Sequence, residues 1–497
     1  MRYLLGLDNG GTMTKAALFE ETGREVAVAS RETPLSTPQA DWNERDMDAL
    51  WQANIECIRE VLEKSNINAD CIVGVGCTGH GKGLYLWGKD NKPAYFGIAS
   101  TDRRAENIID RWNKDGTAQK SRDKTLQPVI SCQPVTLLRW LKENEPTILN
   151  NVKWVFSCKD YIRFRLTGKA MAEETDYSGT CLMNLHTRQF DKELLSLFGI
   201  EEMFECLPPL CNALDVCGSI TKEVAKLTGL CEGTPVCGGM FDIDACALAM
   251  GVTKPEQFCM ITGTWSINEY PAIAPVRPDT TTHNSVFCVP NTYLIEESSP
   301  TSAGNLDWVL QTFMQNEKDK AKAEGVRFYD RVDSWVEALP PEQCPVIFLP
   351  YLYGTNTDTD HAAFIGLSNS HTSAHVLRAV FEGVVFSHKL HFERLLSFRQ
   401  PPKTIRLAGG AARSQVWVQM FADIMQYPIE VVSTKELGAQ GCAIAAAVAA
   451  GIYSDAIEAI DKMMPEVKTV LPNIETAKIY NDKYTRFVKL TKCLEGF

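Results

Sequence analysis

Asp242 stands where a glycine-rich strand end meets a helix of small residues, an arrangement typical of a catalytic base facing a ligand. The segment CGGMFDIDACALAMG (residues 237–251) puts a glycine pair before Asp242 and alternating alanines after it. Glycines let a strand end come close to a ligand, and alanines let the following helix pack tightly behind it. The same pattern also allows a plainer interpretation, in which Asp242 only N-caps the helix, because aspartate is strongly favoured at that position.

The segment DNGGTMTK (residues 8–15) has the composition of a phosphate-binding hairpin between two strands. Its glycines let backbone N–H groups turn inward and its threonine hydroxyls add donors, so that together they can form a concave anion site. Asp8 can position Mg²⁺ through water, because Mg²⁺ favours carboxylate oxygen and keeps several of its waters. The alternative is an ordinary Gly-Gly hairpin turn. The segment does not follow the Walker pattern, in which Gly-Lys-Ser/Thr opens a helix.

Two later segments have the composition of further nucleotide-binding segments. ITGTWSIN (261–268) repeats the strand, glycine turn and hydroxyl residues of the first segment, which predicts a second phosphate hairpin. Two such hairpins facing each other across a cleft would grip the β- and γ-phosphates. LAGGAARSQVWVQMFADIM (407–425) combines a strand, a glycine pair and a helix whose N-terminal amides can accept an adenosine moiety. For this segment the alternative is plain packing of a strand against a helix.

The elements that must position these segments alternate between strands and helices, which predicts a mixed α/β layer fold. Runs at 2–8, 15–20 and 24–30 predict three adjacent antiparallel strands, followed by a helix that Asp46 caps and a strand at 71–77. Later elements are predicted as a strand pair within 257–270, strands at 345–352 and 405–410, and helices near 373–398, 414–426 and 437–451. The repeated hairpin pattern predicts two domains, 1–252 and 253–497.

The composition fits a two-domain globular protein that binds small molecules. At 497 residues, 45% of them hydrophobic, the chain exceeds what one core usually supports. A net charge of -12 disfavours nucleic acid and anionic membranes as partners, because both need a basic face, although local amides can still hold a small anion. The Ala-rich run 441–453 is too short to span a bilayer. We therefore expect a cytoplasmic protein, with a homodimer as one option for its assembly.

The chain resembles the FGGY carbohydrate kinases of the actin-like, hexokinase-type ATPase superfamily over essentially its whole length. The most specific stretch is AAFIGLSNSHTSAHVLRAVFEG (362–383), which carries the Gly-Leu of the family followed at fixed spacing by His-Val and Ala-Val-Phe-Glu. Within the family it is most similar to the L-xylulose kinases, through TGHGKGLYL (78–86), STDRRA (100–105), QPVTLLRWLKENEP (133–146) and SPTSAGNLDW (299–308). It departs from the common pattern at Ala99, Ser100, Leu137 and 354–364, positions that bear on the choice of sugar.

The resemblance implies a two-domain actin-like ATPase fold of the ribonuclease H-like type, with a duplicated mixed-sheet core and a cleft between the lobes. It implies that Asp242 rather than Asp244 is the catalytic base, since counting back from Gly251 in the family pattern selects Asp242. The residues implied for ATP are Asp8, Gly10, Gly11, Thr12, Thr14, Lys15, Gly263, Thr264, Trp265, Gly304, Gly409, Gly410 and Ser414. The residues implied for the sugar pocket are Glu44, His80, Asp102 and Arg104, each of which can alternatively be an ordinary surface or capping residue.

The implied activity is transfer of the γ-phosphoryl group of ATP, with Mg²⁺, to a terminal hydroxyl of a small ketose, with L-xylulose as the first expectation. Asp242 would accept the proton of that hydroxyl, which is a poor nucleophile on its own. Kinases for another ketopentose or a polyol, of the D-xylulose, ribulose or erythritol type, are the alternatives within the family. A non-catalytic, nucleotide-switched actin-like protein is a different alternative, against which Asp242 and the polar sugar-pocket segments weigh. A sugar-sensing transcriptional regulator is disfavoured by the acidic composition.

Overall fold

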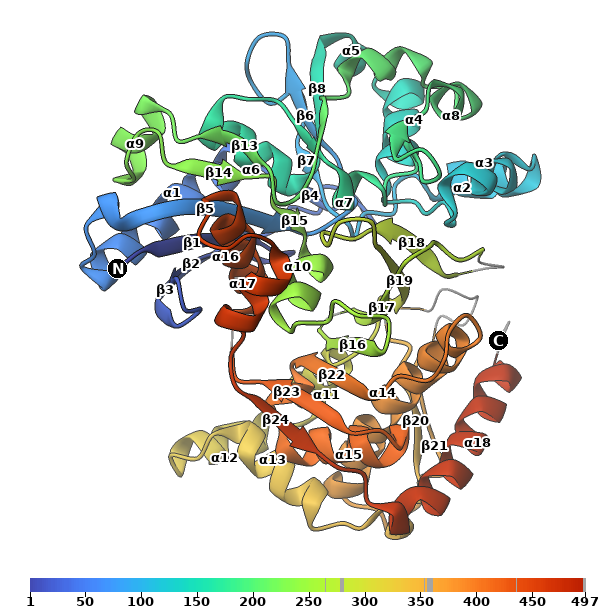
Figure 1. The fold of residues 1–497 in the computed structure, drawn as a ribbon. Helices are drawn as coiled ribbons and strands as arrows, with labels where there is room; N and C mark the ends of the chain where they lie inside the picture. The colour runs from blue at the N-terminus through green and yellow to red at the C-terminus, as the bar shows by residue number, and fades with distance from the viewer. Residues whose placement is uncertain (264, 278–280, 353, 355–360, 435, 495–497) are drawn as a thin grey trace. The chain divides into compact units, whose positions relative to one another are not determined.

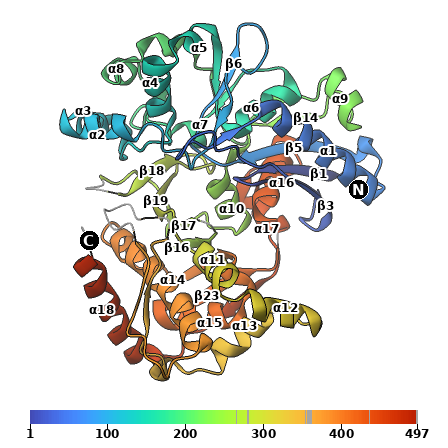
Figure 2. The same ribbon diagram turned by 180° about the vertical axis from the view of Figure 1, so that it is seen from behind.

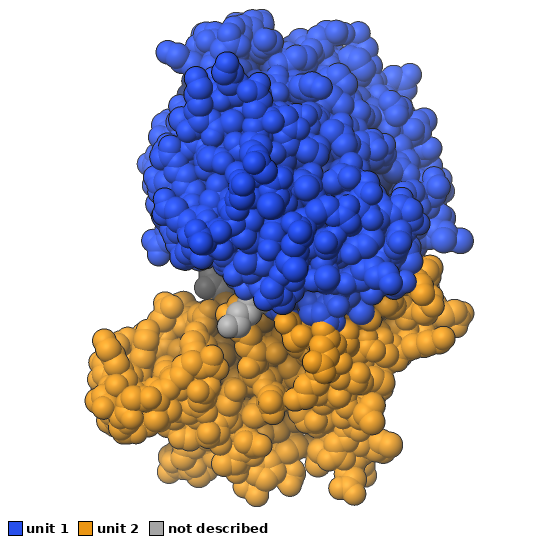
Figure 3. Space-filling view, turned by 60° about the vertical axis from the view of Figure 1, so that its left-hand side comes forward, with its two compact units in different colours: residues 1–253, 272–294, 434–465 blue, residues 254–271, 295–433, 466–497 orange. Residues whose placement is uncertain are grey.

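The computed structural model describes residues 1–497 except 264, 278–280, 353, 355–360, 435 and 495–497 (Figure 1). It contains two compact units, coloured separately in Figure 3. Unit 1 comprises residues 1–253, 272–294 and 434–465, and unit 2 comprises residues 254–271, 295–433 and 466–497. The chain forms two seven-stranded sheets, which confirms the predicted mixed α/β fold class.

The first sheet has the strand order β13-β14-β5-β1-β2-β3, with β15 also paired to β5. Its strands are β1 (Tyr3–Asn9), β2 (Met13–Glu20), β3 (Glu25–Glu32), β5 (Ile72–Gly79), β13 (Val216–Ser219), β14 (Pro235–Cys237) and β15 (Met240–Phe241). The pairs β1/β2 and β2/β3 are antiparallel, as the sequence predicts. Strands β1 and β15 both run parallel to β5, so the ends of these three strands lie together at one edge of the sheet.

The first sheet is covered on its two faces by helices from distant parts of the chain. Helix α1 (Met47–Ser65) begins after Asp46, whose side chain accepts two backbone N–H groups, as predicted. Its apolar residues share a core cluster with Leu5 and Leu7. Helix α16 (Leu437–Ala449) contacts β1 at Gly6, where an added Cβ would lie 2.0 Å from the carbonyl oxygen of Ala439. Successive residues of a strand face opposite sides of a sheet. Gly6 therefore faces α16, and its neighbours Leu5 and Leu7 face α1.

The remaining elements of unit 1 form the layers around this sheet (Figure 2). They are β4 (Glu44–Arg45), β6 (Tyr85–Gly88), β7 (Gly97–Ile98), β8 (Val152–Phe156), β9 (Ala172–Glu173), β10 (Met183–Asn184), β11 (Gln189–Phe190), β12 (Leu210–Cys211), α2 (Glu106–Lys114), α3 (Thr117–Thr125), α4 (Pro134–Asn144), α5 (Pro146–Asn151), α6 (Cys158–Thr167), α7 (Glu174–Tyr177), α8 (Lys192–Leu197), α9 (Lys222–Thr228), α10 (Asp242–Ala249) and α17 (Ala456–Met463).

The second sheet has the strand order β18-β19-β17-β16-β22-β23-β24. Its strands are β16 (Gln257–Thr262), β17 (Ser266–Ala272), β18 (His283–Val286), β19 (Tyr293–Ser299), β22 (Thr404–Gly409), β23 (Ile429–Val432) and β24 (Val467–Val470). Strand β16 is antiparallel to β17 and parallel to β22, which repeats the pairing of β1 with β2 and with β5. The predicted duplication of the core is therefore confirmed. The strand predicted at 345–352 is shorter, because β20 (Ile347–Leu349) ends where its pairing with β21 (Ala363–Ile365) ends.

The helices of unit 2 pack beside its strands and on one another (Figure 1). They are α11 (Gly304–Phe313), α12 (Gln315–Ala323), α13 (Phe328–Glu337), α14 (Ser373–Leu396), α15 (Gln415–Met425) and α18 (Ala477–Leu494). The helices predicted at 373–398, 414–426 and 437–451 correspond to α14, α15 and α16, and their ends agree to within two residues. None of the helices in the described part of the chain combines the length and the apolar character needed to cross a membrane.

Candidate active site

Three of the predicted site residues come together at the ends of neighbouring strands in unit 1. Asp8 of β1 and Met240 of β15 are both in register with Thr78 of β5. Asp242 follows β15 directly, and the backbone N–H of His80, just after β5, donates to the carbonyl oxygen of Asn9 at 3.0 Å. The parallel pairing therefore brings Asp8, His80 and Asp242 to one edge of the sheet.

Asp242 is the accessible member of the aspartate pair at the start of α10. The helix begins at Asp242, its N-cap residue is Phe241, and no side-chain cap hydrogen bond is made. The alternative interpretation of Asp242 as the N-cap is therefore not what the structure shows. Asp242 is partly exposed as a residue, whereas Asp244 is fully buried and accepts the backbone N–H of Cys288 at 3.3 Å.

The surroundings of Asp242 make its carboxylate a stronger proton acceptor than a carboxylate in water. Enclosure by protein, followed by the negative charges of Asp8 and Asp176, raises the pKa of Asp242 well above its usual range, while Lys82 opposes the shift. Enclosure also raises the pKa of Asp8 to about 6, against the effect of Lys15. Two carboxyl groups with raised pKa values at one sheet edge are typical of a catalytic site.

The first predicted hairpin presents its tip to solvent. Gly11 and Thr12 are exposed, and a Cβ added at Gly11 would meet nothing within 4 Å. The carbonyl oxygens of Gly10 and Gly11 accept hydrogen bonds from the buried guanidinium of Arg45, the first at 3.2 Å. Sequence reasoning missed Arg45, because nothing in the segment DWNERD distinguishes a buried arginine from an exposed one.

Thr14 and Lys15, also predicted to contact ATP, already have partners within unit 1. The buried hydroxyl of Thr14 donates to Asn9 Oδ1 at 3.1 Å, so it supports the hairpin from behind. Lys15 Nζ lies 2.8 Å from Glu436 Oε2, just before α16. The start of α16 also approaches Asp8, because a Cβ added at Gly438 would lie 2.6 Å from Asp8 Oδ2. The positive end of the helix dipole therefore lies beside the hairpin and favours anions there.

Arg104, Asp102 and Glu44 form one buried ionic cluster beside the predicted sugar segments. Arg104 Nη2 lies 2.8 Å from Asp102 Oδ2 and 2.9 Å from Glu44 Oε1. The guanidinium also stacks on Trp42, with its carbon 4.2 Å from the ring centroid. The side chains of Arg104 and Asp102 have no exposed surface. Their charges are therefore paired inside unit 1, where they hold the segments around them in place.

His80 and Lys82 follow β5 on one tight turn. Burial lowers the pKa of His80 to about 3, so its ring is neutral, and Nε2 lies 2.9 Å from the hydroxyl of Tyr85. Lys82 has a backbone φ of 60°, a value uncommon for residues other than glycine, and its Nζ lies 5.7 Å from the ring centroid of Phe241. Sequence reasoning missed Lys82, although a lysine between two glycines directly after a strand was a usable signal.

The two predicted nucleotide segments of unit 2, 261–268 and 407–425, meet at the ends of β16 and β22. Thr262 Oγ1 donates to the carbonyl oxygen of Ala408 at 2.8 Å and accepts the N–H of Ala411 at 3.0 Å. The N–H of Gly410 donates to the carbonyl oxygen of Thr262 at 2.7 Å. Gly409 has a φ of 88°, and a Cβ there would lie 2.4 Å from the same oxygen, so only glycine fits this approach.

His388 of α14 joins the second hairpin to the loop before Gly304. Its Nδ1 lies 2.8 Å from Asn268 Oδ1, its Nε2 lies 3.0 Å from Ser302 Oγ, and Ser266 Oγ is in contact with the ring. Burial lowers the pKa of His388 to about 3, so this junction is neutral. Gly263 and Trp265 of the hairpin are partly exposed, and Thr264 lies outside the described residues.

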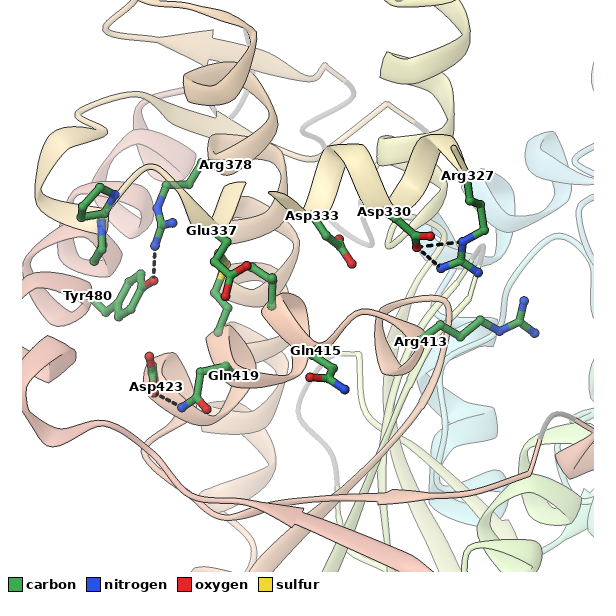
Figure 4. Close-up of a pocket in the computed structure, with 14 residues that line it drawn as sticks. Arg327, Asp330, Asp333, Glu337, Arg378, Arg413, Gln415, Gln419, Asp423 and Tyr480 are labelled. Atoms are coloured by element: carbon green, nitrogen blue, oxygen red, sulfur yellow. Dashed lines mark hydrogen bonds and ion pairs between the residues drawn. The ribbon is translucent and has the colours of Figure 1, made fainter. Parts of the chain in front are cut away.

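Ser414 stands in the chain between Arg413 and Gln415, which both line a cavity of about 660 Å³ in unit 2 (Figure 4). Its hydroxyl caps α15 by accepting the N–H of Trp417 at 3.1 Å, and it donates to Asp333 Oδ1 at 2.8 Å. The cavity is lined by Arg327, Asp330, Asp333, Glu337, Pro340, Pro341, Arg378, Arg413, Gln415, Val416, Gln419, Met420, Asp423 and Tyr480. Figure 4 shows α13 residues on one side and α15 residues on the other.

Comparison with known proteins identifies the class to which this fold and these segments belong. Residues 3–249 match the N-terminal domain, and residues 259–450 the C-terminal domain, of the FGGY family of carbohydrate kinases. The structure of ligand-bound xylulose kinase from Lactobacillus acidophilus has the same fold, with a TM-score of 0.89, 24% identity and coverage of 100% of this chain and 99% of that one. The predicted actin-like kinase fold is thereby confirmed.

The chain belongs to the FGGY family of carbohydrate kinases. It is 37% identical over 500 residues to the L-xylulose/3-keto-L-gulonate kinase of Escherichia coli, covering 100% of this chain and 98% of the relative. It is 35% identical over 500 residues to the probable L-xylulose kinase of Haemophilus influenzae, with full coverage of both chains. The resemblance stated from the sequence is confirmed, and the chain is a sugar kinase that uses ATP.

Proposed function

We propose that this kinase phosphorylates L-xylulose on a terminal hydroxyl. The observation that carries the proposal is the full-length identity of 37% and 35% to relatives named for L-xylulose. The partial exposure of Asp242, at the edge of the sheet in unit 1, supports it.

In the proposed reaction Asp242 is the catalytic base. The carboxylate accepts the proton of the sugar hydroxyl, the freed oxygen forms a bond to the γ-phosphorus, and the bond from that phosphorus to ADP breaks. The raised pKa of Asp242 suits this task, because it makes the carboxylate a stronger proton acceptor than a carboxylate in water. Asp244 is buried and already accepts a backbone N–H, so it is not assigned this role.

Both units contain segments to which we assign contacts with the nucleotide. In unit 1, Asp8, Gly10, Gly11 and Thr12 would bind phosphate, with Thr14 and Lys15 as supports rather than direct ligands. In unit 2, Gly263, Thr264 and Trp265 would bind phosphate, and Gly304, Gly409, Gly410 and Ser414 would bind adenosine. The cavity beside Ser414 would take the adenosine itself, because the carboxylates of Asp330 and Asp333 can accept hydrogen bonds from its amino and hydroxyl groups.

The carboxylate of Asp8 fits an Mg²⁺ ion that arrives with ATP. Asp8 is partly exposed at the end of β1, and enclosure by protein raises its pKa to about 6 against the effect of Lys15. A bound Mg²⁺ would neutralise charge on the phosphates, and it favours one or two carboxylates together with waters and phosphate oxygens. Asp8 would hold it through water.

The sugar is proposed to contact His80, with Glu44, Asp102 and Arg104 fixing the shape of the pocket from behind. A second candidate substrate is 3-keto-L-gulonate, which the name of the E. coli relative includes. Lys82 favours this candidate, because no ion pair of its ammonium group is found within the described residues and a carboxylate on the sugar would supply one.

A coupled assay of ADP release tests the proposal, with Mg·ATP and a panel of L-xylulose, 3-keto-L-gulonate, D-xylulose, L-ribulose, erythritol, glycerol and fructose. We expect the highest kcat/KM on L-xylulose. A kcat/KM for glycerol or fructose more than tenfold above that for L-xylulose would contradict the proposal. The Lys82→Met variant separates the two candidates, because it should reduce activity on 3-keto-L-gulonate more than activity on L-xylulose.

A further inference from the structure

The backbone immediately before Asp242 is held by buried side chains from outside its own strand. The carbonyl oxygen of Met240 accepts the hydroxyl of Thr78 at 2.7 Å. The N–H of Phe241 donates to the hydroxyl oxygen of Thr175 at 3.0 Å. Both hydroxyl groups belong to fully buried residues, so water does not compete for these hydrogen bonds. The direction in which the chain enters α10, and therefore the direction of Asp242, depends on them.

The hydroxyl of Thr175 has a fixed orientation, because both of its hydrogen-bonding roles are used. It donates its proton to Glu173 Oε2 at 2.7 Å while it accepts the N–H of Phe241. The other oxygen of Glu173 accepts the N–H of Thr175 at 2.9 Å, which locks the two side chains into one ring. A hydroxyl has a single proton, so reversing one bond would break the other.

Glu173 is in turn held by a buried cluster of charges on α6. Lys159 Nζ lies 3.1 Å from Glu173 Oε2 and 3.0 Å from Asp160 Oδ1. Arg163 lies 2.7 Å from the same oxygen of Asp160, and its guanidinium donates to the carbonyl oxygen of Gly238, in the glycine pair before β15. None of these charged side chains has exposed surface.

Burying this many charges is expensive, and their mutual attraction only partly offsets the loss of hydration. A core of apolar side chains would stabilise the unit at least as well. The cluster instead provides directional contacts that end at two points of the backbone, Gly238 before β15 and Phe241 at the end of β15. Directional contacts define position more narrowly than apolar packing does, and misplacement of a catalytic group by about 1 Å can cost two orders of magnitude in rate.

We propose that Thr175, held by Glu173 and Lys159, is a positioning residue that aims the carboxylate of Asp242 at the sugar hydroxyl. The inference rests on the proposed role of Asp242. Thr175 does not touch the substrates itself. It acts through a single hydrogen bond to the residue before the base, so its removal affects the chemical step and leaves substrate binding in place.

The test compares Thr175→Val, which keeps the shape and loses the hydroxyl, with Thr175→Ser, which keeps the hydroxyl. The matched control is Thr228→Val, because Thr228 is also buried, and its hydroxyl likewise donates one hydrogen bond, to the backbone oxygen of Val224, and accepts one backbone N–H, that of Leu230. With the best sugar of the panel, Thr175→Val should lower kcat at least tenfold while KM for sugar and for ATP changes less than twofold. Thr175→Ser and Thr228→Val should stay within threefold of the wild-type kcat.

A second measurement does not depend on the assignment of the reaction. Hydrogen exchange of the Phe241 amide should be at least tenfold faster in Thr175→Val than in the wild type, and unchanged in Thr175→Ser and Thr228→Val. An inactive wild-type protein would contradict the proposed function. The exchange rate of the Phe241 amide could still be compared between the variants, because that measurement needs no enzyme activity. Unchanged exchange at Phe241, a wild-type kcat in Thr175→Val, or equal damage in Thr175→Ser would overturn the positioning role.

Discussion

The buried polar groups that support Asp242 in unit 1 are charged, whereas those that support the second hairpin in unit 2 are neutral. In unit 1, Lys159 lies 3.0 Å from Asp160 and 3.1 Å from Glu173. In unit 2, His388 lies 2.8 Å from Asn268 and 3.0 Å from Ser302. Both clusters are enclosed, and each lies directly behind a segment assigned to phosphoryl transfer.

The difference follows from what each segment has to do. A proton acceptor works best with a raised pKa, and the pKa of Asp242 is raised by enclosure in protein, by the negative charge of Asp8 and then by that of Asp176, at the edge of the charged cluster. A phosphate-binding hairpin needs donors and no additional negative charge, so a neutral histidine is a suitable support. The comparison teaches that the charged cluster sets both position and electrostatics, whereas the neutral cluster sets position alone.

The largest expected effect on stability is that of Lys159→Met. Lys159 is the cation shared by Asp160, Glu173 and Asp176, and its removal leaves buried carboxylates without their partner. Breaking a buried ion pair from one side typically costs about 3–5 kcal/mol. The free energy of unfolding measured by chemical denaturation should therefore fall by this amount in Lys159→Met. A loss below about 1 kcal/mol would show that the cluster is not a tightly coupled unit.

The next effect is a pH dependence to which Asp176 of the charged cluster contributes. Burial raises the pKa of Asp176 to about 6, against the effect of Lys159. A carboxyl group with a raised pKa holds its proton longer in the folded state, so the free energy of unfolding should fall as the pH rises from about 4 to about 6. A shift of this size is worth roughly 3 kcal/mol. In Asp176→Asn, the part of this pH dependence that comes from Asp176 should disappear from denaturation midpoints measured between pH 4 and 7.

A pH effect of the opposite sign is expected from the neutral cluster. The pKa of His388 is lowered to about 3, so stability should fall as the pH drops below about 6.5, where the unfolded chain takes up a proton and the folded one does not. At neutral pH, His388→Leu should cost about 1–3 kcal/mol, because Asn268 and Ser302 lose buried partners. It should also raise KM for ATP more than KM for sugar. Equal changes in both KM values would argue against a link to the nucleotide segments.

The smallest effect on stability is expected at the glycines of the two hairpins. A Cβ at Gly11 would meet nothing within 4 Å, and one at Gly263 would lie 3.7 Å from the carbonyl oxygen of Trp265. Gly11→Ala and Gly263→Ala should therefore fold with unchanged denaturation midpoints. Each should raise KM for ATP by at least about tenfold, or ~1.4 kcal/mol of binding free energy, because the Cβ keeps phosphate from the backbone. An unchanged KM in either variant would remove that hairpin from the phosphate site.

The hairpins, the helix capped by Asp46 and the duplicated sheet could be predicted because each is encoded in a short stretch of sequence. Glycines and hydroxyl residues between apolar runs identify the hairpins whatever surrounds them. Asp242 and Asp244 could be told apart only through the family pattern, since their local sequences are nearly equivalent. The structure supplies the physical difference, which is that Asp242 is partly exposed and Asp244 is fully buried.

The supporting residues could not be predicted, because their roles depend on partners far away in the chain. Lys15 pairs with Glu436, which lies 421 positions later. His388 joins residues more than 80 positions before it, and Thr175 acts on a backbone group 66 positions away. A lysine, a histidine or a threonine carries no local signal for such a role. Burial in the folded structure is what identifies them.

The central claim, that Asp242 is the base of a carbohydrate kinase, is tested most directly by comparing Asp242→Asn with Asp244→Asn in the coupled assay. The amide keeps the shape of the carboxylate and cannot accept the proton. Asp242→Asn should therefore lower kcat by about 10²- to 10⁴-fold while ATP and sugar still bind. Asp244→Asn should keep most of the activity, because that carboxyl group is fully buried and already accepts the backbone N–H of Cys288. Equal losses in the two variants, or a larger loss in Asp244→Asn, would contradict the assignment.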